Sequence, residues 1–198
     1  KTEHQKMANE AWNKYQSFKP DLVILGDDAA LKYLGEKFSN EKIPVLFLGI
    51  NNNPRNYFKA QKIPQNMTGV LERPILKRTF QYNKEIFPNS KTALILFDTD
   101  LTANIVKKEM YNDKDDIDIL GIKTDLKLIE NYSSWKDIVS TAKGKYDFIV
   151  LGLYQTLKDD SGNYVKPDEV AKWTSENSPV PIFGFWDFSI GKDAAIGG

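Results

Sequence analysis

Residues 43–55 read Ile43-Pro-Val-Leu-Phe-Leu-Gly-Ile-Asn-Asn-Asn-Pro-Arg55, and this stretch decides the fold. The apolar part, residues 43–48, predicts a strand covered on both faces, and residues 49–54 predict a polar loop at its carboxyl end. In open α/β sheets, ligands bind beyond the carboxyl ends of the strands. A second apolar run, Thr92–Phe97, leads in the same way into Asp98-Thr-Asp-Leu-Thr102. Two such units predict two lobes whose polar loops face one cleft.

Length and composition exclude several classes of protein. The chain has 198 residues, of which 41% are hydrophobic, so it can bury a core as one domain or two small lobes. Lys+Arg and Asp+Glu are equal at 27 each, so nucleic acid is not an expected partner. No apolar run approaches the roughly 20 residues that span a bilayer. Cysteine is absent, which excludes disulfides and thiolate chemistry but fits exported and cytosolic proteins alike.

Helical and strand patterns alternate along the chain. Helices are predicted over residues 2–18, 29–37, 74–86, 102–110 and 134–142, and strands over 22–25, 43–48, 92–97, 117–122, 148–153 and 180–185. Strands separated by helices of about ten residues predict parallel sheets with right-handed crossovers, so the fold class is α/β. The predicted division is lobe 1 over residues 1–72, lobe 2 over 73–184, and a return crossing toward lobe 1 over 185–198. Residues 66–72 are expected to cross between the lobes.

Four motifs resemble the uncharacterised ABC-transporter substrate-binding protein family. They are Pro20-Asp-Leu-Val-Ile-Leu-Gly-Asp-Asp-Ala-Ala-Leu31, Ile43-Pro-Val-Leu-Phe-Leu-Gly49, Asn66-Met-Thr-Gly-Val70, and Gly184-Phe-Trp-Asp187 with Ala195-Ile-Gly-Gly198. The resemblance covers nearly all of the chain and implies a two-lobed type I periplasmic-binding-protein fold; some members bind tryptophan or other aromatic amino acids. The family begins ahead of Lys1 and continues past the final Gly-Gly, so we expect a chain trimmed at both ends. A lobe without its first strand exposes a sheet edge.

Polar residues after the first-lobe strands are candidate ligand contacts. Asp27 and Asp28 are either a pair that caps the following helix or part of the cleft wall. The resemblance implies that the ligand lies at the amino end of this helix, a common place for ligands. Asn51 and Asn52 are either turn residues or ligand contacts, because Asn tolerates the left-handed conformation. The resemblance favours contact for both.

Candidate ligand contacts in the second lobe also follow strands. Asp98 and Thr102 belong to the loop expected to close over the ligand, with Asp100 or Thr102 capping the next helix. Tyr154 and Trp186 are either core residues or aromatic platforms for the ligand. Adjacent Asp187 completes the ligand-binding set. Acids gathered at a partly desolvated cleft favour a ligand with a positive group. These acids are Asp27, Asp28, Asp98, Asp100 and Asp187.

One enzyme interpretation depends on residues 96–102, Leu-Phe-Asp-Thr-Asp-Leu-Thr. A strand that ends in Asp-x-Asp-x-Thr resembles the first motif of haloacid-dehalogenase-like phosphatases, in which the first Asp is the nucleophile. Those enzymes also need a Lys and a later acidic motif that holds magnesium, whereas Gly26-Asp-Asp28 lies upstream, in the wrong order. His4 is the only histidine, so neither a metal site nor a histidine-based triad is predicted. We predict no catalytic residue and no cofactor.

The expected function is capture of a small molecule, an amino acid or an amine, in a cleft that closes by hinge motion. The predicted partner is an ABC permease, and the predicted location is the periplasm or another extracytoplasmic compartment of a bacterium. No signal peptide is present, but the sequence begins at Lys1, so this absence does not argue for the cytoplasm. The alternative is the extracytoplasmic sensor domain of a membrane signalling protein, since both uses share one fold.

Overall fold

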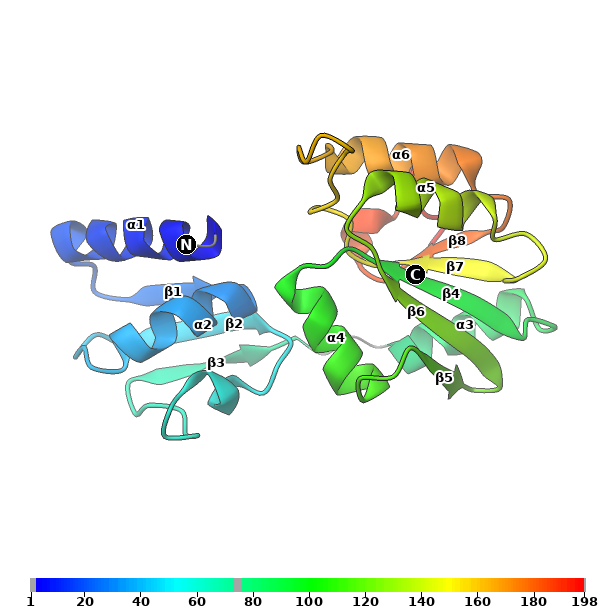
Figure 1. Cartoon of the computed structure of the whole chain (residues 1–198). Coiled ribbons are helices and arrows are strands. Elements are labelled where there is room, and N and C mark those ends of the chain that lie inside the picture. The colour runs from blue at the N-terminus through cyan, green and yellow to red at the C-terminus, as the bar shows by residue number, and fades with distance from the viewer. Residues whose placement is uncertain (1–2, 73–75, 198) are drawn as a thin grey trace. The chain divides into compact units, whose positions relative to one another are not determined.

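The computed structural model describes residues 3–72 and 76–197, and the chain divides into two compact units (Figure 1). Unit 1 is Lys1–Pro74 and unit 2 is Ile75–Gly198. Both are built from mostly parallel strands flanked by helices, so the predicted α/β class is confirmed. Pro74, the expected start of a helix, lies outside the described residues.

Unit 1 contains a three-stranded parallel sheet in the order β1-β2-β3. Its elements are α1 Glu3–Phe18, β1 Val23–Gly26, α2 Asp27–Phe38, β2 Val45–Ile50, a 3-10 turn over Pro54–Tyr57, and β3 Met67–Leu71. The prediction that residues 66–72 cross between lobes is wrong for most of this stretch. Met67 is buried and pairs with Val45, so the segment forms the third strand of the sheet.

Helices cover only one face of the unit 1 sheet. On that face Phe47 and its neighbours pack against α1 and α2. Leu46 and Leu48 point the other way and remain 38% and 48% exposed. The prediction that residues 43–48 are covered on both faces is therefore wrong. The strand is apolar on both sides, but within the described residues only one side has a layer to pack against.

Unit 2 contains a five-stranded sheet in the order β5-β6-β4-β7-β8. Its elements are α3 Leu76–Ile86, β4 Thr92–Phe97, α4 Leu101–Tyr111, β5 Asp116–Ile119, β6 Ile122–Leu128, α5 Tyr132–Ser140, β7 Phe148–Leu151, α6 Pro167–Asn177, β8 Ile182–Gly184 and a 3-10 turn over Asp187–Ser189. Residues 117–122 were expected to form one strand, but Leu120 and Gly121 form a turn between β5 and antiparallel β6. Both have positive φ, 56° and 80°, as two-residue hairpin turns require.

The unit 2 sheet is covered on both faces. Helices α5 and α6 lie over one side and α3 and α4 over the other (Figure 1). Strand β4 pairs with β6 on one edge and with β7 on the other, so its residues 93–97 are fully buried. This arrangement places the loop after β4 beside the loop after β7.

The last residues of the described chain pack on unit 2. Gly184 N–H donates to the carbonyl of Gly197 (2.6 Å), and Ile196 N–H donates to the carbonyl of Ile182 (2.8 Å). Ala195 is 1% exposed and belongs to the core under α5 and α6. Up to Gly197 this segment therefore stays with β8, and a return crossing toward lobe 1 stays a prediction.

Candidate ligand-binding site

The carboxyl ends of β1, β2 and β3 bring three polar residues together around Gly49. A Cβ placed on Gly49 would lie 3.7 Å from the backbone nitrogen of Asp27 and 3.8 Å from Glu72 Oε2. The Asn51 side chain donates to the same Glu72 oxygen at 3.5 Å. The sequence interpretation missed Glu72 because it took residues 66–72 as a crossing. A prediction of a third strand before Glu72 would have placed Glu72 at this edge of the sheet.

Asp28 is fully buried and organises the loop after β2. Its Oδ2 accepts the N–H of Asn51 (2.9 Å), and its Oδ1 accepts the N–H of Asn52 (3.1 Å) and the hydroxyl of Tyr57 (2.7 Å). Burial, with the Asp28 hydrogen bond as a further cause, raises the pKa of Tyr57 above its usual value, so Tyr57 remains a donor at neutral pH. The prediction that Asp28 caps α2 is wrong, because the cap position belongs to Gly26 and the Asp28 carboxylate serves this loop.

Asp27 and Asn52 are the predicted residues of unit 1 that remain partly or wholly exposed. Asp27 has φ of 71°, an uncommon value for a residue other than Gly that Asp tolerates better than most, and its Oδ1 accepts the N–H of Asp28 at 2.6 Å. The Asn52 side chain donates to Tyr57 OH and accepts from the N–H of Asn53 and the side chain of Asn56. Asn52 therefore bonds within its own loop without the left-handed conformation that the turn alternative assumed, and its contact with a ligand stays a prediction.

Asp98 joins the loops after β4 and β7. Its carboxylate is 1% exposed, Oδ1 accepts the N–H of Asp100 (3.1 Å) and Oδ2 accepts the N–H of Thr156 (2.9 Å). A phosphatase nucleophile must reach its substrate, and this carboxylate is instead turned toward backbone donors. Thr102 is buried in the first turn of α4. Asp100 occupies the N-cap position of α4, which is one of the two predicted alternatives, but its side chain makes no capping hydrogen bond.

Two aromatic side chains near the end of β8 are accessible. Trp186 is partly buried and stacks on Phe188, with ring centroids 5.9 Å apart and planes 14° apart. Phe188 is 50% exposed and was missed by the sequence interpretation. Tyr154, by contrast, is only 4% exposed and packs in the core under α5 and α6. Asp187, the residue between Trp186 and Phe188 in the sequence, is exposed.

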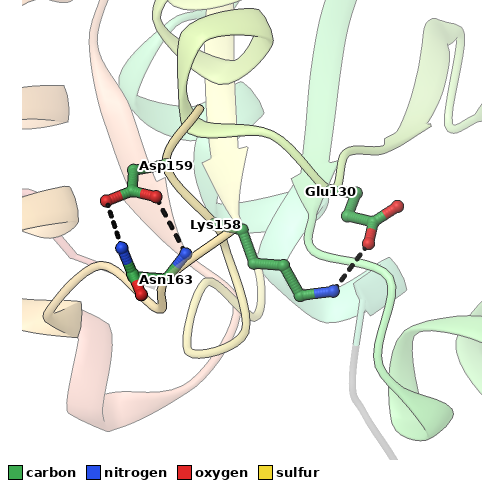
Figure 2. A network of polar contacts seen from close by, with 4 residues as sticks. All are labelled: Glu130, Lys158, Asp159 and Asn163. Carbon is green, nitrogen blue, oxygen red and sulfur yellow. Dashed lines mark hydrogen bonds and ion pairs between the residues drawn. The ribbon is translucent and has the colours of Figure 1, made fainter. Parts of the chain in front are cut away.

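Polar side chains stabilise the loop that follows β7 and join it to the loop after β6, as Figure 2 shows. Lys158 pairs with Glu130 at 2.8 Å, and Asp159 accepts hydrogen bonds from the backbone and side chain of Asn163. The Asn163 backbone hydrogen bond is the main cause that lowers the pKa of Asp159. The Asp159 carboxylate thus stabilises the turn over residues 159–163. Across residues 3–72 and 76–197, no three His, Cys, Asp or Glu side chains are grouped to hold a metal ion.

The fold has counterparts among solved structures. A ligand-free, open substrate-binding protein with adhesive properties from Clostridium difficile aligns with 90% of this chain and 57% of its own, with 17% identity and a TM-score of 0.52. The ABC domain from Streptococcus pneumonia in complex with L-Trp aligns with 91% and 59%, with 16% identity and a TM-score of 0.58. A conserved domain protein from Vibrio cholerae aligns with 91% and 58%, with 15% identity and a TM-score of 0.58.

This chain therefore has the fold of ABC-type substrate-binding proteins, as the sequence motifs predicted. It spans 57% to 59% of the length of the three solved chains. No family model matches the sequence, and no curated protein matches it. Among the described helices, none has the length and hydropathy needed to cross a membrane.

The buried Asp98 gives unit 2 a defined dependence on pH. Burial raises the Asp98 pKa above 3.8, so the folded state binds a proton more readily than the unfolded chain. The contribution of Asp98 to the free energy of unfolding is therefore highest at low pH. It falls as pH rises through the raised pKa that Asp98 has in the folded state. Asp98→Asn abolishes this titration. We expect the free energy of unfolding of the wild type minus that of Asp98→Asn to decrease as pH rises from 3.8 toward neutrality.

Urea denaturation at a series of pH values measures this difference. Asp100→Asn is the matched control, because Asp100 lies two residues away and is more exposed. If the wild-type and Asp98→Asn curves stay parallel at every pH, Asp98 has the same pKa in the folded and unfolded states and the prediction is wrong.

Proposed function

We propose that this chain is the solute-binding part of an extracytoplasmic substrate-binding protein and that its ligand is an amino acid or a related amine. The observation that supports this best is the acidic edge of the unit 1 sheet. There Asp27 is exposed and Glu72 is partly buried beside Asn51. Carboxylates that lose water when a ligand covers them need a positive partner, and an ammonium group supplies it.

Unit 2 offers an aromatic surface on which a ligand can stack. Trp186 and Phe188 form a stacked pair in which Phe188 is 50% exposed and Trp186 is partly buried. An aromatic ring stacked on such a pair gains about 0.5–1.5 kcal/mol beyond the area it buries, and a cation over Trp gains about 0.5–2 kcal/mol. We propose that Trp186 and Phe188 contact ligand, with Asp187 adding charge.

The buried carboxylates have a different role in this proposal. Asp28 and Asp98 each accept hydrogen bonds from two backbone N–H groups of strand-end loops, and neither is accessible. They therefore position the loops, while the ligand contacts exposed or partly buried side chains. Binding requires burial and a few oriented polar groups, so no chemical step is proposed.

The proposed partner is an ABC permease. Its support is the fold shared with a structure described as an ABC domain. The alternative use, sensing by a membrane signalling protein, needs the same ligand capture. The gene that encodes the chain discriminates between them, since a transmembrane helix followed by a kinase or cyclase domain would contradict the permease assignment.

A thermal-shift screen tests the ligand class. The panel contains L-tryptophan, other amino acids, polyamines, sugars and dicarboxylates. Because a ligand that binds only the folded state stabilises it by mass action, the largest shift is expected from an amine. Asp27→Asn is expected to weaken binding of that amine by roughly tenfold, since it removes one charge and keeps the side-chain shape.

Asp21→Asn is the matched control in unit 1. Asp21 is exposed like Asp27 but precedes β1, so it lies at the opposite end of the strand. It should leave the affinity for the amine unchanged. A largest shift from a dicarboxylate or a neutral sugar, or an Asp27→Asn variant that binds the amine as the wild type does, would contradict this ligand assignment.

A further inference from the structure

Strand β5 lies at one edge of the unit 2 sheet (Figure 1). Among the described strands it pairs with β6 alone. The N–H of Leu126 donates to the carbonyl of Asp115 (2.7 Å), so the backbone groups of Asp115 point toward β6. In an antiparallel pair, the backbone groups of successive residues point alternately toward the partner strand and away from it. Those of Asp116 and Asp118 therefore point to the free edge, where another strand can pair.

An apolar hollow of about 470 Å³ follows this edge. The four consecutive residues 117–120 line it. Successive side chains of a strand point to opposite faces, so a hollow that all four residues line lies along the strand edge. Leu76 of α3 and Met110 of α4 contribute apolar side chains to its other walls.

A cationic hollow of about 510 Å³ adjoins the apolar one, since Lys77 and Leu120 line both. Arg78 and Tyr82 also line it, and the Arg78 guanidinium lies 5.8 Å from the centroid of the Tyr82 ring. The Nζ of Lys84 donates to the Leu120 carbonyl (2.8 Å), which fixes the hairpin turn to α3. Within residues 3–72 and 76–197, the ion pairs include neither Lys77 nor Arg78. These two cations can therefore receive an anionic group.

Charge and apolarity alternate along β5. Asp116 and Asp118 are exposed, whereas Ile117 and Ile119 pack with the core under α3 and α4. Side chains directly opposite each other on neighbouring strands lie on the same face of the sheet. A strand that pairs with this edge is therefore most stable with basic side chains opposite the two acids and apolar side chains opposite the two isoleucines. A second copy of β5 would place acids against acids, which is destabilising.

We propose that the free edge of β5 is a docking surface for an extended segment of another protein, in which basic and apolar residues alternate and an acidic residue lies at the Leu120 end. The backbone of the segment pairs with Asp116 and Asp118, its apolar side chains enter the hollow beside Met110, and its acidic residue reaches Lys77 and Arg78. In this type of recognition, main-chain hydrogen bonds give affinity and pockets for alternate side chains give specificity.

The direction of the segment follows from the stability of the two kinds of strand pair. Antiparallel pairs are slightly more stable per residue than parallel ones, so we expect the segment to run antiparallel to β5. Its acidic residue then comes first. Read from its amino end, the pattern is acidic, apolar, basic, apolar, basic. The synthetic peptide acetyl-Glu-Val-Lys-Val-Lys-amide has this pattern and serves as the probe.

Hydrogen exchange at single amides, followed by NMR, tests the proposal. With saturating peptide, the amides of Asp116 and Asp118 are expected to exchange at least roughly tenfold more slowly, because they then donate to the added strand. The Ile117 amide points toward β6, so it is the internal reference and should be protected with and without peptide. The control peptide acetyl-Lys-Val-Glu-Val-Glu-amide keeps the apolar spacing and reverses the charges. It should bind at least roughly fivefold more weakly.

Paired variants locate the two charged ends of the surface. Lys77→Glu is expected to weaken the probe peptide by roughly fivefold, and acetyl-Lys-Val-Lys-Val-Lys-amide should restore binding to this variant. Lys108→Glu is the matched control, because Lys108 is exposed on α4 and lines neither hollow. Asp116→Asn should weaken the probe by roughly threefold. Its control, Asp113→Asn, changes an exposed acid that precedes β5 and should have no effect.

Three outcomes would overturn the proposal. The first is that the Asp116 and Asp118 amides exchange equally fast with and without the probe peptide. The second is that the charge-reversed peptide binds as tightly as the probe. The third is that the two amides become protected as the protein concentration rises without peptide, which would assign the edge to a second copy. The amine ligand takes no part in these measurements, so the proposed solute-binding function is tested separately.

Discussion

Replacing Asp28 with alanine is expected to lower the free energy of unfolding of unit 1 by about 3 kcal/mol or more. Asp28 is 0% exposed, and its carboxylate is the acceptor for the N–H groups of Asn51 and Asn52 and for the hydroxyl of Tyr57. The variant leaves these donors without their acceptor, two of them at the loop that we propose contacts the ligand. Denaturation of fluorotryptophan-labelled protein measures the effect, because Trp12 is the tryptophan of unit 1.

Tyr57→Phe is the graded control for this prediction. It removes one of the three donors and leaves the Asp28 carboxylate bonded to Asn51 and Asn52, so the expected loss is about 0.5–1.5 kcal/mol. If Asp28→Ala and the wild type lose the native Trp12 signal at the same denaturant concentration, Asp28 does not organise this loop.

Replacing Trp135 with alanine is expected to lower the free energy of unfolding of unit 2 by about 3–5 kcal/mol. Trp135 is fully buried in the core that α5 and α6 form with the sheet. Its Nε1–H also donates to the hydroxyl of Thr174 at 2.9 Å, which links the two helices. The truncation removes a large apolar surface and leaves a cavity. The midpoint and slope of a urea transition followed by circular dichroism give the change.

Thr174→Val separates the hydrogen bond from the packing. Valine keeps the shape of threonine but offers no acceptor to the buried indole N–H, so the expected loss is about 1–3 kcal/mol. A loss from Thr174→Val as large as that from Trp135→Ala would mean that the hydrogen bond, and not the packed ring, dominates at this position.

Patterns between residues close in sequence predicted most of the elements. The apolar run Thr92–Phe97 was predicted as a buried strand and forms β4 with the same bounds. The three-to-four-residue spacing of apolar side chains predicted α1, which ends at Phe18 as expected. Such signals are local, because side-chain periodicity depends only on the geometry of the element itself.

Errors arose where pairing between distant segments decides the structure. Residues 67–71 look like a connection until Val45 and Phe47 are available to pair with them. Residues 117–128 contain two strands because the positive φ values at Leu120 and Gly121 reverse the chain. One face of β2 is open because, among the described helices, only α1 and α2 pack against that sheet. The apolar run itself does not encode this property.

The candidate site residues show the same contrast between local sequence signals and contacts between distant segments. The sequence by itself determined that acids and amides follow the strands, since a residue's position after an apolar run is a local property. Tertiary structure alone decided which of these groups face solvent. Asp28 accepts from a backbone N–H 23 residues away and Asp98 from one 58 residues away, so both acids became loop anchors. Glu72 joined the candidate residues of unit 1 through a contact across the sheet, and Phe188 joined those of unit 2 through a contact between rings. A buried carboxylate is tolerated only where donors surround it, and those donors come together only when the chain folds.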